Sequence, residues 1–226
     1  ANQIDFGTVL HGLESNNISV VFPTQSGWNL MGIPIFLNSI TYGHDAKPGY
    51  SANDIVAPNG LYDVAEFCKN HLYEFENDTV PIHYKYENDH VFGGLVSRLL
   101  IVKDYLGSAY IQEFSFNGIG NFEQLEGYQY KVTTNYYWKY TGTPLYNTTS
   151  NSVEMVQTYY TNGWKIFGFP YLYEVSADFY FSDLVEQDLL VIAKSNTGTA
   201  FLPEWNFNGI GNLKPGQGYQ VKIKNV

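Results

Sequence analysis

The clearest alternation of hydrophobic and polar positions lies near the C-terminal end of the chain. In residues 218–224, tyrosine, valine and isoleucine alternate with glutamine and two lysines. Because successive side chains of a β-strand point to opposite faces, this segment predicts a strand with one buried face and one solvent face. Residues 189–193 form a short apolar run before the turn KSNTG, and residues 199–202 predict the returning strand of a hairpin.

Further elements complete the pattern in this half of the chain. Residues 164–173 favour a strand but contain Pro170, which cannot donate a backbone hydrogen bond, so we expect an edge strand or a bulge. Ser182 is placed to cap a short helix, with Asp183 and Glu186 in the first turn, where the helix dipole favours negative charge. The glycine-rich stretch NGIGNLKPGQG predicts a tight corner before the last strand.

The same pattern occurs twice. Residues 99–132 align without gaps on residues 190–223 at an offset of 91, and sixteen of the 34 positions are identical. Upstream, the motif GW-x-x-x-G-x-P recurs at an offset of 136, so the first copy holds 45 extra residues. The predicted fold is a β-rich α+β protein with two tandem copies of a small antiparallel sheet module. Each copy has one short helix, and the first carries an insertion.

The repeat predicts four segments along the chain. An N-terminal arm covers residues 1–22, and the first copy covers residues 23–133 with its insertion at about 41–87. An aromatic linker at 134–158 joins it to the second copy, residues 159–226. In the first copy the expected helix is VFGGLVSRLL from Val91, although each of its two glycines disfavours a helix by about 1 kcal/mol.

Several aromatic residues and glycines are candidates for special roles. The linker aromatics favour either a strand packed on a neighbour or an exposed contact patch; they are Tyr136, Tyr137, Trp138 and Tyr140. The corner glycines are expected to hold conformations that other residues resist; they are Gly118, Gly120, Gly209 and Gly211. Trp28 and Trp164 open the first strand of each copy, and we expect both to lie in the core.

Composition and charge narrow the choice of partners. The 226 residues include 12 basic and 22 acidic side chains, a net charge of −10, which disfavours binding to nucleic acid or to an anionic membrane. No apolar run approaches the length of a membrane span, and the first residues lack the pattern of a signal peptide. Cys68 is the only cysteine, which excludes an intrachain disulfide.

The sequence contains no strong catalytic or metal-binding motif. Cys68 and His71 are spaced to meet on one face of a helix, but no oxyanion-hole signature accompanies them, so we expect a structural cysteine. The histidines lack the paired spacing of zinc ligands, and the acidic residues of the second copy favour a solvated surface over a calcium site. We therefore expect no enzymatic activity, no cofactor and no metal.

The repeated blocks carry a resemblance to a known module. The run LPEWNFNGIGNLKPGQGYQVKI, preceded by GW-x-x-x-G-x-P and L-x-I-x-K-x-x-x-G-x-A, resembles a module of marine phage structural proteins, notably tail-fibre and other virion proteins, and of surface proteins of marine and Bacteroidetes bacteria. The resemblance covers residues 23–37, 90–133 and 159–226, and it implies an architectural module without catalytic residues. The first copy departs from the second at Gln112, Gln124 and Leu125, so its corner is expected to be looser.

This resemblance implies a virion structural protein, a fibre, spike or capsid decoration component, located on a virion or extracellular surface. The alternative is a carbohydrate-binding or adhesive surface module of a bacterium or virus, with exposed tyrosine and tryptophan stacking on sugar rings. Expected partners are other virion or surface proteins and a host-surface glycan, without nucleic acid or membrane insertion. Because two small sheets leave open edges and the arm is apolar, we also expect a homo-oligomer.

Overall fold

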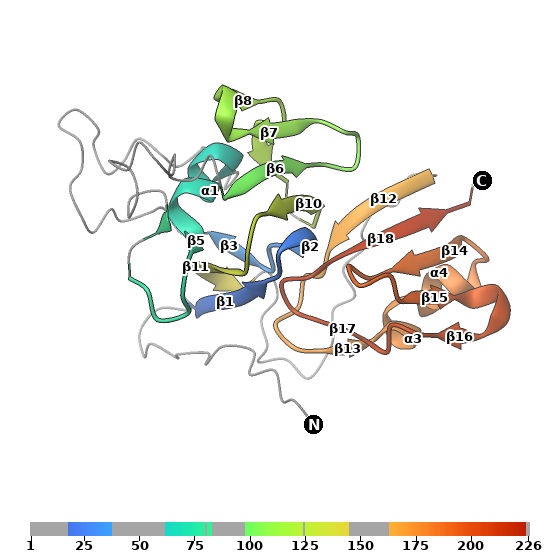
Figure 1. Cartoon of the computed structure of the whole chain (residues 1–226). Helices are drawn as coiled ribbons and strands as arrows, with labels where there is room; N and C mark the ends of the chain where they lie inside the picture. Colours follow the sequence, from blue (N-terminus) through green and yellow to red (C-terminus); the bar gives the residue numbers. More distant parts are fainter. Residues whose placement is uncertain are drawn as a thin grey trace.

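The computed structural model describes residues 18–37, 62–79, 81–82, 98–123, 125–144 and 163–224. Short strands dominate this part of the chain, all of them pair antiparallel, and three short helices accompany them (Figure 1). The β-rich class with several antiparallel sheets, predicted from the alternating segments, is therefore confirmed.

Two five-stranded sheets have corresponding strand orders. The first has the order β2-β10-β6-β7-β8 and the second the order β12-β18-β14-β15-β16. The strands of the first are β2 (Gly27–Gly32), β6 (Leu99–Lys103), β7 (Ala109–Ile111), β8 (Phe116–Asn117) and β10 (Gly127–Val132). Those of the second are β12 (Gly163–Gly168), β14 (Leu190–Lys194), β15 (Ala200–Leu202), β16 (Phe207–Asn208) and β18 (Gly218–Ile223). A bulge leaves Leu100 in β6 and Val191 in β14 without a partner, at positions that the sequence alignment matches.

Each sheet is accompanied by a small two-stranded ladder and by a helical segment that follows its first strand in the chain. The ladders are β4 (Tyr62–Asp63) with β9 (Asn121–Phe122), and β13 (Val175–Ser176) with β17 (Asn212–Leu213). The helices are α1 (Val64–His71), α3 (Ala177–Tyr180) and α4 (Ser182–Glu186). A single-turn 3-10 helix follows the hairpin of each sheet, at η1 (Gln112–Phe114) and η2 (Pro203–Trp205). The Asp63 carboxylate accepts a hydrogen bond from the Glu66 N–H at 3.0 Å, which caps α1.

The helices differ in detail from those predicted. Ser182 does not cap a helix, because α3 already occupies the preceding turn; its hydroxyl donates to the Phe179 carbonyl at 2.8 Å instead. Residues 91–97 of the helix expected from Val91 lie outside the described residues. The last two residues of that expected helix, Leu99 and Leu100, belong instead to strand β6. The helix α1 lies within residues 41–87, where the sequence predicts the insertion.

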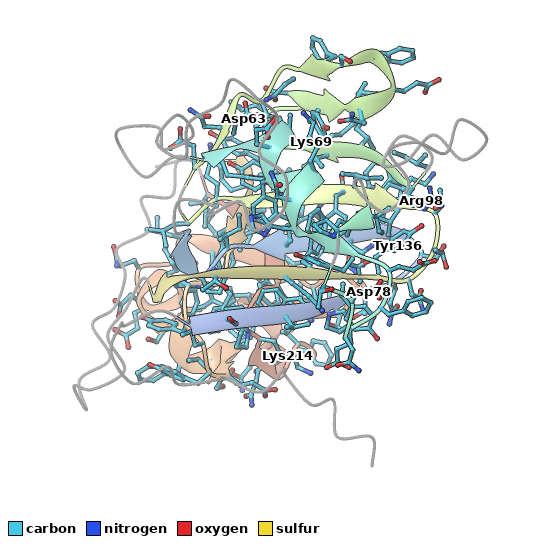
Figure 2. All side chains as sticks on the ribbon, turned by 90° about the vertical axis from the view of Figure 1, so that its left-hand side faces the viewer. Asp63, Lys69, Asp78, Arg98, Tyr136 and Lys214 are labelled. Carbon is cyan, nitrogen blue, oxygen red and sulfur yellow. The ribbon has the colours of Figure 1, made fainter. Side chains whose placement is uncertain are left out.

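A third sheet forms around part of the predicted linker. Its central strand is β11 (Tyr136–Pro144), and it pairs with β1 (Ile18–Thr24), β3 (Ile35–Leu37) and β5 (Leu72–Tyr73). Residues 18–22 of the predicted arm thus pair with their own chain. Figure 2 shows this sheet toward the viewer, with Tyr136 and Asp78 labelled at the same end of it and with Asp63 and Lys69 on the ribbon above. Residues 1–17 and 145–158 lie outside the described residues.

Two separate cores stabilise these sheets. In the first, Phe67 of α1 packs on Trp138 of β11 with ring centroids 5.3 Å apart and on Phe122 at 5.0 Å. In the second, Phe167 packs on Tyr219 at 5.6 Å, beside the helical residues of α3 and α4. Each such aromatic pair contributes about 0.5–1.5 kcal/mol beyond the burial of its area. Each five-stranded sheet therefore has one face covered by its own core.

The two five-stranded sheets meet where four glycine backbones come into contact. Gly32 and Gly168 end β2 and β12, and Gly127 and Gly218 begin β10 and β18. A Cβ added to Gly32 would overlap the Gly168 Cα, and one added to Gly127 or Gly218 would lie 2.6 or 2.7 Å from a carbonyl oxygen of the other sheet. These four residues are referred to below as the glycine joint. Figure 1 shows the result, with β12 and β18 beside β10 and β2.

Hydrogen bonds across the glycine joint are reciprocal. The Gly32 N–H donates to the Gly216 carbonyl at 3.0 Å, and the Gly168 N–H donates to the Leu125 carbonyl at 2.9 Å. Gly32 corresponds to Gly168 at the offset of 136, and Leu125 corresponds to Gly216 at the offset of 91. Each of these hydrogen bonds is therefore the counterpart of the other. The isolated bridges follow the same rule, pairing Met31 with Gln217 and Phe167 with Glu126. Reciprocal contacts of this kind characterise a two-fold, isologous interface.

The repeated block NGIGN forms a loop held by its first asparagine. The Asn117 Oδ1 accepts the Gly120 N–H at 2.9 Å, and the Asn208 Oδ1 accepts the Gly211 N–H at 2.7 Å. Gly120 and Gly211 have φ angles of 79° and 74°, which favour glycine. Gly118 and Gly209 have ordinary φ angles but no room for a side chain. A Cβ at Gly209 would lie 2.9 Å from the Ala200 carbonyl oxygen and 2.8 Å from the Phe207 ring.

The glycine joint predicts a specific stability loss. Gly168→Ala should lower the free energy of unfolding by about 1–3 kcal/mol, because its methyl group would lie 2.7 Å from the Gly32 Cα and from the Glu126 carbonyl oxygen. Urea denaturation measures the change, with Val191→Ala at the exposed bulge as the control. A Gly168→Ala variant as stable as Val191→Ala would contradict the close contact.

The NGIGN loop predicts a second loss. Gly209→Val should destabilise the protein by about 1–3 kcal/mol, because the branched side chain must displace the Phe207 ring and the Ala200 carbonyl. Thermal unfolding followed by circular dichroism provides the measurement. Equal midpoints for the wild type and the variant would remove the structural role of this glycine.

Candidate functional site

The two paired tryptophans lie on the surface. Trp28 is 43% exposed and Trp164 is 47% exposed, so the expectation that both lie in the core is wrong. The physical reason is strand alternation. In β2 the side chains of Asn29 and Met31 share the buried face with residues of β10, which turns Trp28 to the solvent face.

Two lysines lie close to each indole ring. The Lys131 Nζ is 5.7 Å from the Trp28 ring centroid, and the Lys103 Nζ is 5.9 Å from it. Lys131 is the direct cross-strand partner of Trp28, and Lys103 comes from the next strand, β6. These distances are within the range of a cation–π contact.

The second sheet repeats this arrangement. The Trp164 ring centroid is 5.3 Å from the Lys194 Nζ and 6.0 Å from the Lys222 Nζ. Together with two glutamines on the same strand faces, these residues are referred to below as the Trp–Lys face. Its members are Trp28, Lys103, Gln129 and Lys131 on the first sheet and Trp164, Lys194, Gln220 and Lys222 on the second.

The Trp–Lys face is identical in the two sheets, whereas most buried positions differ. The differing buried pairs include Val102 and Ala193, Tyr110 and Phe201, Phe122 and Leu213, Tyr130 and Val221, and Val132 and Ile223. Tyr128 and Tyr219 are identical because each hydroxyl has a structural role, accepting a backbone N–H from Glu123 at 2.7 Å and from Lys214 at 2.8 Å, respectively. Surface substitutions usually change stability by less than about 0.5 kcal/mol, so packing does not explain the identity of the solvent face.

A groove of about 440 Å³ lies between the two sheets, next to the glycine joint. The first sheet contributes Lys103, Gln129 and the hairpin turn 104–107. The second sheet contributes Trp164, Lys165, Ile166, Lys194 and Gln220. Since Lys103 and Lys194 also lie beside Trp28 and Trp164, the groove joins the two halves of the Trp–Lys face.

The groove and the Trp–Lys face are rich in lysine, while Asp104 also lines the groove and the Glu126 carboxylate interacts electrostatically with Lys165. Five of the chain's 12 basic residues lie here: Lys103, Lys131, Lys165, Lys194 and Lys222. Within the described part of the chain, none of the five ammonium groups has a carboxylate within ion-pair distance. The Lys165 Nζ lies 3.5 Å from the Tyr105 ring centroid, and the Asp104 carboxylate accepts the Ser108 N–H at 2.8 Å in its own turn.

The other predicted contact residues do not join this face. Tyr136 and Trp138 are buried, Tyr137 is half-buried, and Tyr140 belongs to β11 with its side chain outside the described residues. Tyr136 and Trp138 therefore belong to the first core and offer no contact surface. The corner glycines lie beside β8 and β16, at the edge of each sheet opposite to the tryptophans.

A second set of exposed aromatic residues was not predicted from the sequence. It lies at the far edge of each sheet, near η1 and η2, and consists of Phe114, Phe116, Trp205 and Phe207. These residues form matched pairs at the offset of 91, and that recurrence in polar surroundings is the signal that could have identified them. Each of these four residues is more than half exposed in the described part of the structure, and none of them lines the groove.

Cys68 and His71 do not form an activated nucleophile. Burial raises the pKa of the Cys68 thiol, followed by the effect of the nearby Asp63 carboxylate. Burial also lowers the pKa of His71 to about 4, and its Nδ1 lies 2.8 Å from the Lys139 carbonyl oxygen, to which it can donate. At neutral pH both side chains are therefore uncharged, unlike the thiolate of a catalytic cysteine.

The described residues offer no metal site and no membrane-spanning helix, and the chain has no match among known proteins. Among the described residues, no group of three or more His, Cys, Asp and Glu side chains could hold a metal ion. No helix in the described ranges is long and apolar enough to cross a membrane. The chain matches no family model, no curated protein sequence and no solved structure.

The Trp–Lys face predicts a distinctive fluorescence response. In variants that keep a single tryptophan, Trp28 and Trp164 should be quenched more strongly by iodide than by caesium, because the neighbouring lysines attract the anion. Trp138, which is 2% exposed, should resist both ions, and Trp205, which is 72% exposed, serves as the accessible reference. Protection of Trp28 or Trp164 to the level of Trp138 would show that these rings are buried.

Proposed function

We propose that this chain is a non-enzymatic surface-contact module that binds glycans on its Trp–Lys face. The observation that carries the proposal is the pair of exposed indole rings, each with two lysines within about 6 Å. An exposed indole offers a flat apolar surface for the C–H face of a sugar ring. Lysine ammonium and glutamine amide groups beside it can donate hydrogen bonds to sugar hydroxyls.

The proposed binding face rests on a proposed duplication. We infer that the two five-stranded sheets are tandem copies of one module, supported by their strand orders and by their shared bulge. Backbones with positive φ support this too, since they occur in matched pairs: Gly27 and Gly163, Gly107 and Gly198, Ser115 and Asn206, Gly120 and Gly211, and Leu125 and Gly216. Duplication gives each chain two equivalent binding platforms.

Matched contacts also locate the extra residues of the first copy. The Val64 N–H donates to the Gly120 carbonyl, and the Ala177 N–H donates to that of Gly211 in the same way. The offset between matched residues thus falls from 136 at Gly32 to 113 at Val64 and to 91 at Leu99. On this interpretation the first copy carries two insertions, one on each side of β4 and α1, in place of a single one.

The proposed setting of the module is an exposed assembly. Its repeated blocks resemble virion and bacterial surface modules, and this supports a role as a fibre, spike or decoration component of a virus particle. The exposed aromatic residues at the edge strands β8 and β16 offer surfaces for neighbouring subunits. Mass spectrometry of purified particles from the source tests this setting independently of glycan binding.

The glycan proposal predicts the effect of removing the indole rings. A glycan array with the full chain identifies ligands, and calorimetry then compares variants with the best one. The double variant Trp28→Ala/Trp164→Ala should bind at least tenfold more weakly, about 1.4 kcal/mol, because both stacking platforms are lost. Each single variant should lose less.

Trp205→Ala is the matched control, because it removes an exposed indole away from the Trp–Lys face. It should bind like the wild type. If no glycan binds the full chain, or if only the Trp205→Ala variant loses binding, the proposed function is wrong. Circular dichroism checks that every variant is folded.

A further inference from the structure

We infer that the glycan bound by the Trp–Lys face is anionic, with its carboxylate or sulfate group on the sugar ring that stacks on the indole. This inference rests on the proposed function and narrows its ligand class.

Each indole ring has two cations beside it and no counter-ion among the described residues. Lys131 and Lys103 both approach Trp28, and Lys222 and Lys194 both approach Trp164. A cation–π contact leaves the charge of the ammonium group uncompensated. With the sugar ring stacked on the indole, a carboxylate or sulfate at the rim of that sugar could accept hydrogen bonds from the ammonium groups, and charge-assisted bonds of this kind are about twice as strong as neutral ones.

Two lysines elsewhere in the chain have anionic partners. Lys69 pairs with Glu66 at 2.9 Å, and Lys224 pairs with Asp188. The chain has 22 acidic residues, so unpaired cations do not reflect a shortage of carboxylates. Both matched lysine pairs remain identical in the two sheets, and so do their glutamine neighbours, Gln129 and Gln220. The uncompensated cations are thus a shared property of the two platforms.

The placement of the cations favours a sugar acid over a nucleic acid. The ammonium groups lie 5.3–6.0 Å from the ring centroids, close to any ring that stacks on the indole. A uronic acid or a sulfated sugar has its charge on that ring, whereas a nucleotide has its phosphate on the backbone, away from the stacked base. A net charge of −10 also opposes the dense charge of a phosphate chain.

The groove connects the two platforms electrostatically. Lys103 approaches the Trp28 ring and also lines the groove next to Trp164, and Lys194 lies beside Trp164 in the same groove. Lys165 adds a further cation at the Tyr105 ring. One anionic oligosaccharide lying along the groove would therefore meet cations from both sheets, and its affinity should fall as salt screens them.

The experiment compares four probes by calorimetry with the full chain. They are oligogalacturonate for carboxylate, a sulfated carrageenan oligosaccharide for sulfate, cellohexaose as a neutral glycan, and a ten-nucleotide thymidine oligomer. We expect at least one anionic glycan to bind about tenfold or more tighter than cellohexaose, and this advantage to shrink at least about fivefold between roughly 50 and 500 mM NaCl, since salt screens the lysines. Comparison of the first two probes identifies the preferred anionic group.

A pair of charge-matched variants tests the lysines. Lys131→Gln/Lys222→Gln should weaken anionic glycan binding at least about tenfold and change cellohexaose binding less than about twofold, because only the anionic ligand gains from the two charges. Lys69→Gln/Lys224→Gln removes the same net charge outside the face and should change neither, since these lysines already have acidic partners. Equal loss in both variants would show a general charge effect and overturn the inference.

The outcomes separate this inference from the proposed function. Tryptophan-dependent binding of cellohexaose, with no gain for the anionic glycans, overturns the inference and leaves glycan binding intact. Absence of binding to every glycan overturns both. Binding of the thymidine oligomer more tightly than either anionic glycan also overturns both, because it assigns the face to nucleic acid.

Discussion

The arrangement of the two five-stranded sheets depends on backbone contact at the glycine joint. Around Gly32 and Gly168 the two sheets approach so closely that a methyl group on either residue would collide with the other sheet. The contact is made by directional hydrogen bonds between matched residues, not by a layer of side chains. Side-chain interfaces can repack when one residue changes, whereas backbone donors and acceptors allow one geometry. The joint therefore determines how the sheets face each other.

This geometry gives the two faces of each sheet different roles. One face packs on its own aromatic core, and the core residues differ between the sheets because several combinations of apolar side chains fill a similar space. The other face is largely open to solvent, although Leu30 and Ile166 on it are buried, and it has the same tryptophan, lysines and glutamine in both sheets. The joint turns these solvent faces toward one groove, so residues from both sheets can act on one ligand.

In the proposed function, the charge distribution would give the face its selectivity. The chain as a whole repels polyanions, while the five lysines attract an anion only within about 8–10 Å, the screening length at physiological salt. A ligand must therefore come close and stack before it gains from the lysines. Under this proposal, shape and charge would be recognised together, which suits sparsely charged chains better than densely charged ones.

The sequence determined most of the local structure and little of its assembly. The alternation in residues 218–224 predicts which side of β18 is buried, and the alignment of residues 99–132 with 190–223 matches strands that occupy the same sheet positions. The alternation depends on residues that are neighbours in the chain, and the matched sheet positions follow from direct similarity between the two aligned segments. The position of α1 could not be found this way, because residues 62–71 do not resemble the second half in sequence.

Trp28 and Trp164 show what only the tertiary structure decided. In the segment GWNLMG the polar neighbour Asn29 is buried and the apolar Trp28 ring is exposed, so the local pattern of polar and apolar residues indicates the wrong face for the ring. That direction follows from pairing with Lys131, about a hundred residues away, and from the core that covers the opposite face. Likewise, the glycine spacing is visible in the sequence, but the contact between Gly32 and Gly168 is not. Local periodicity is a property of neighbours along the chain, whereas register and close approach between distant strands exist only once the chain has folded.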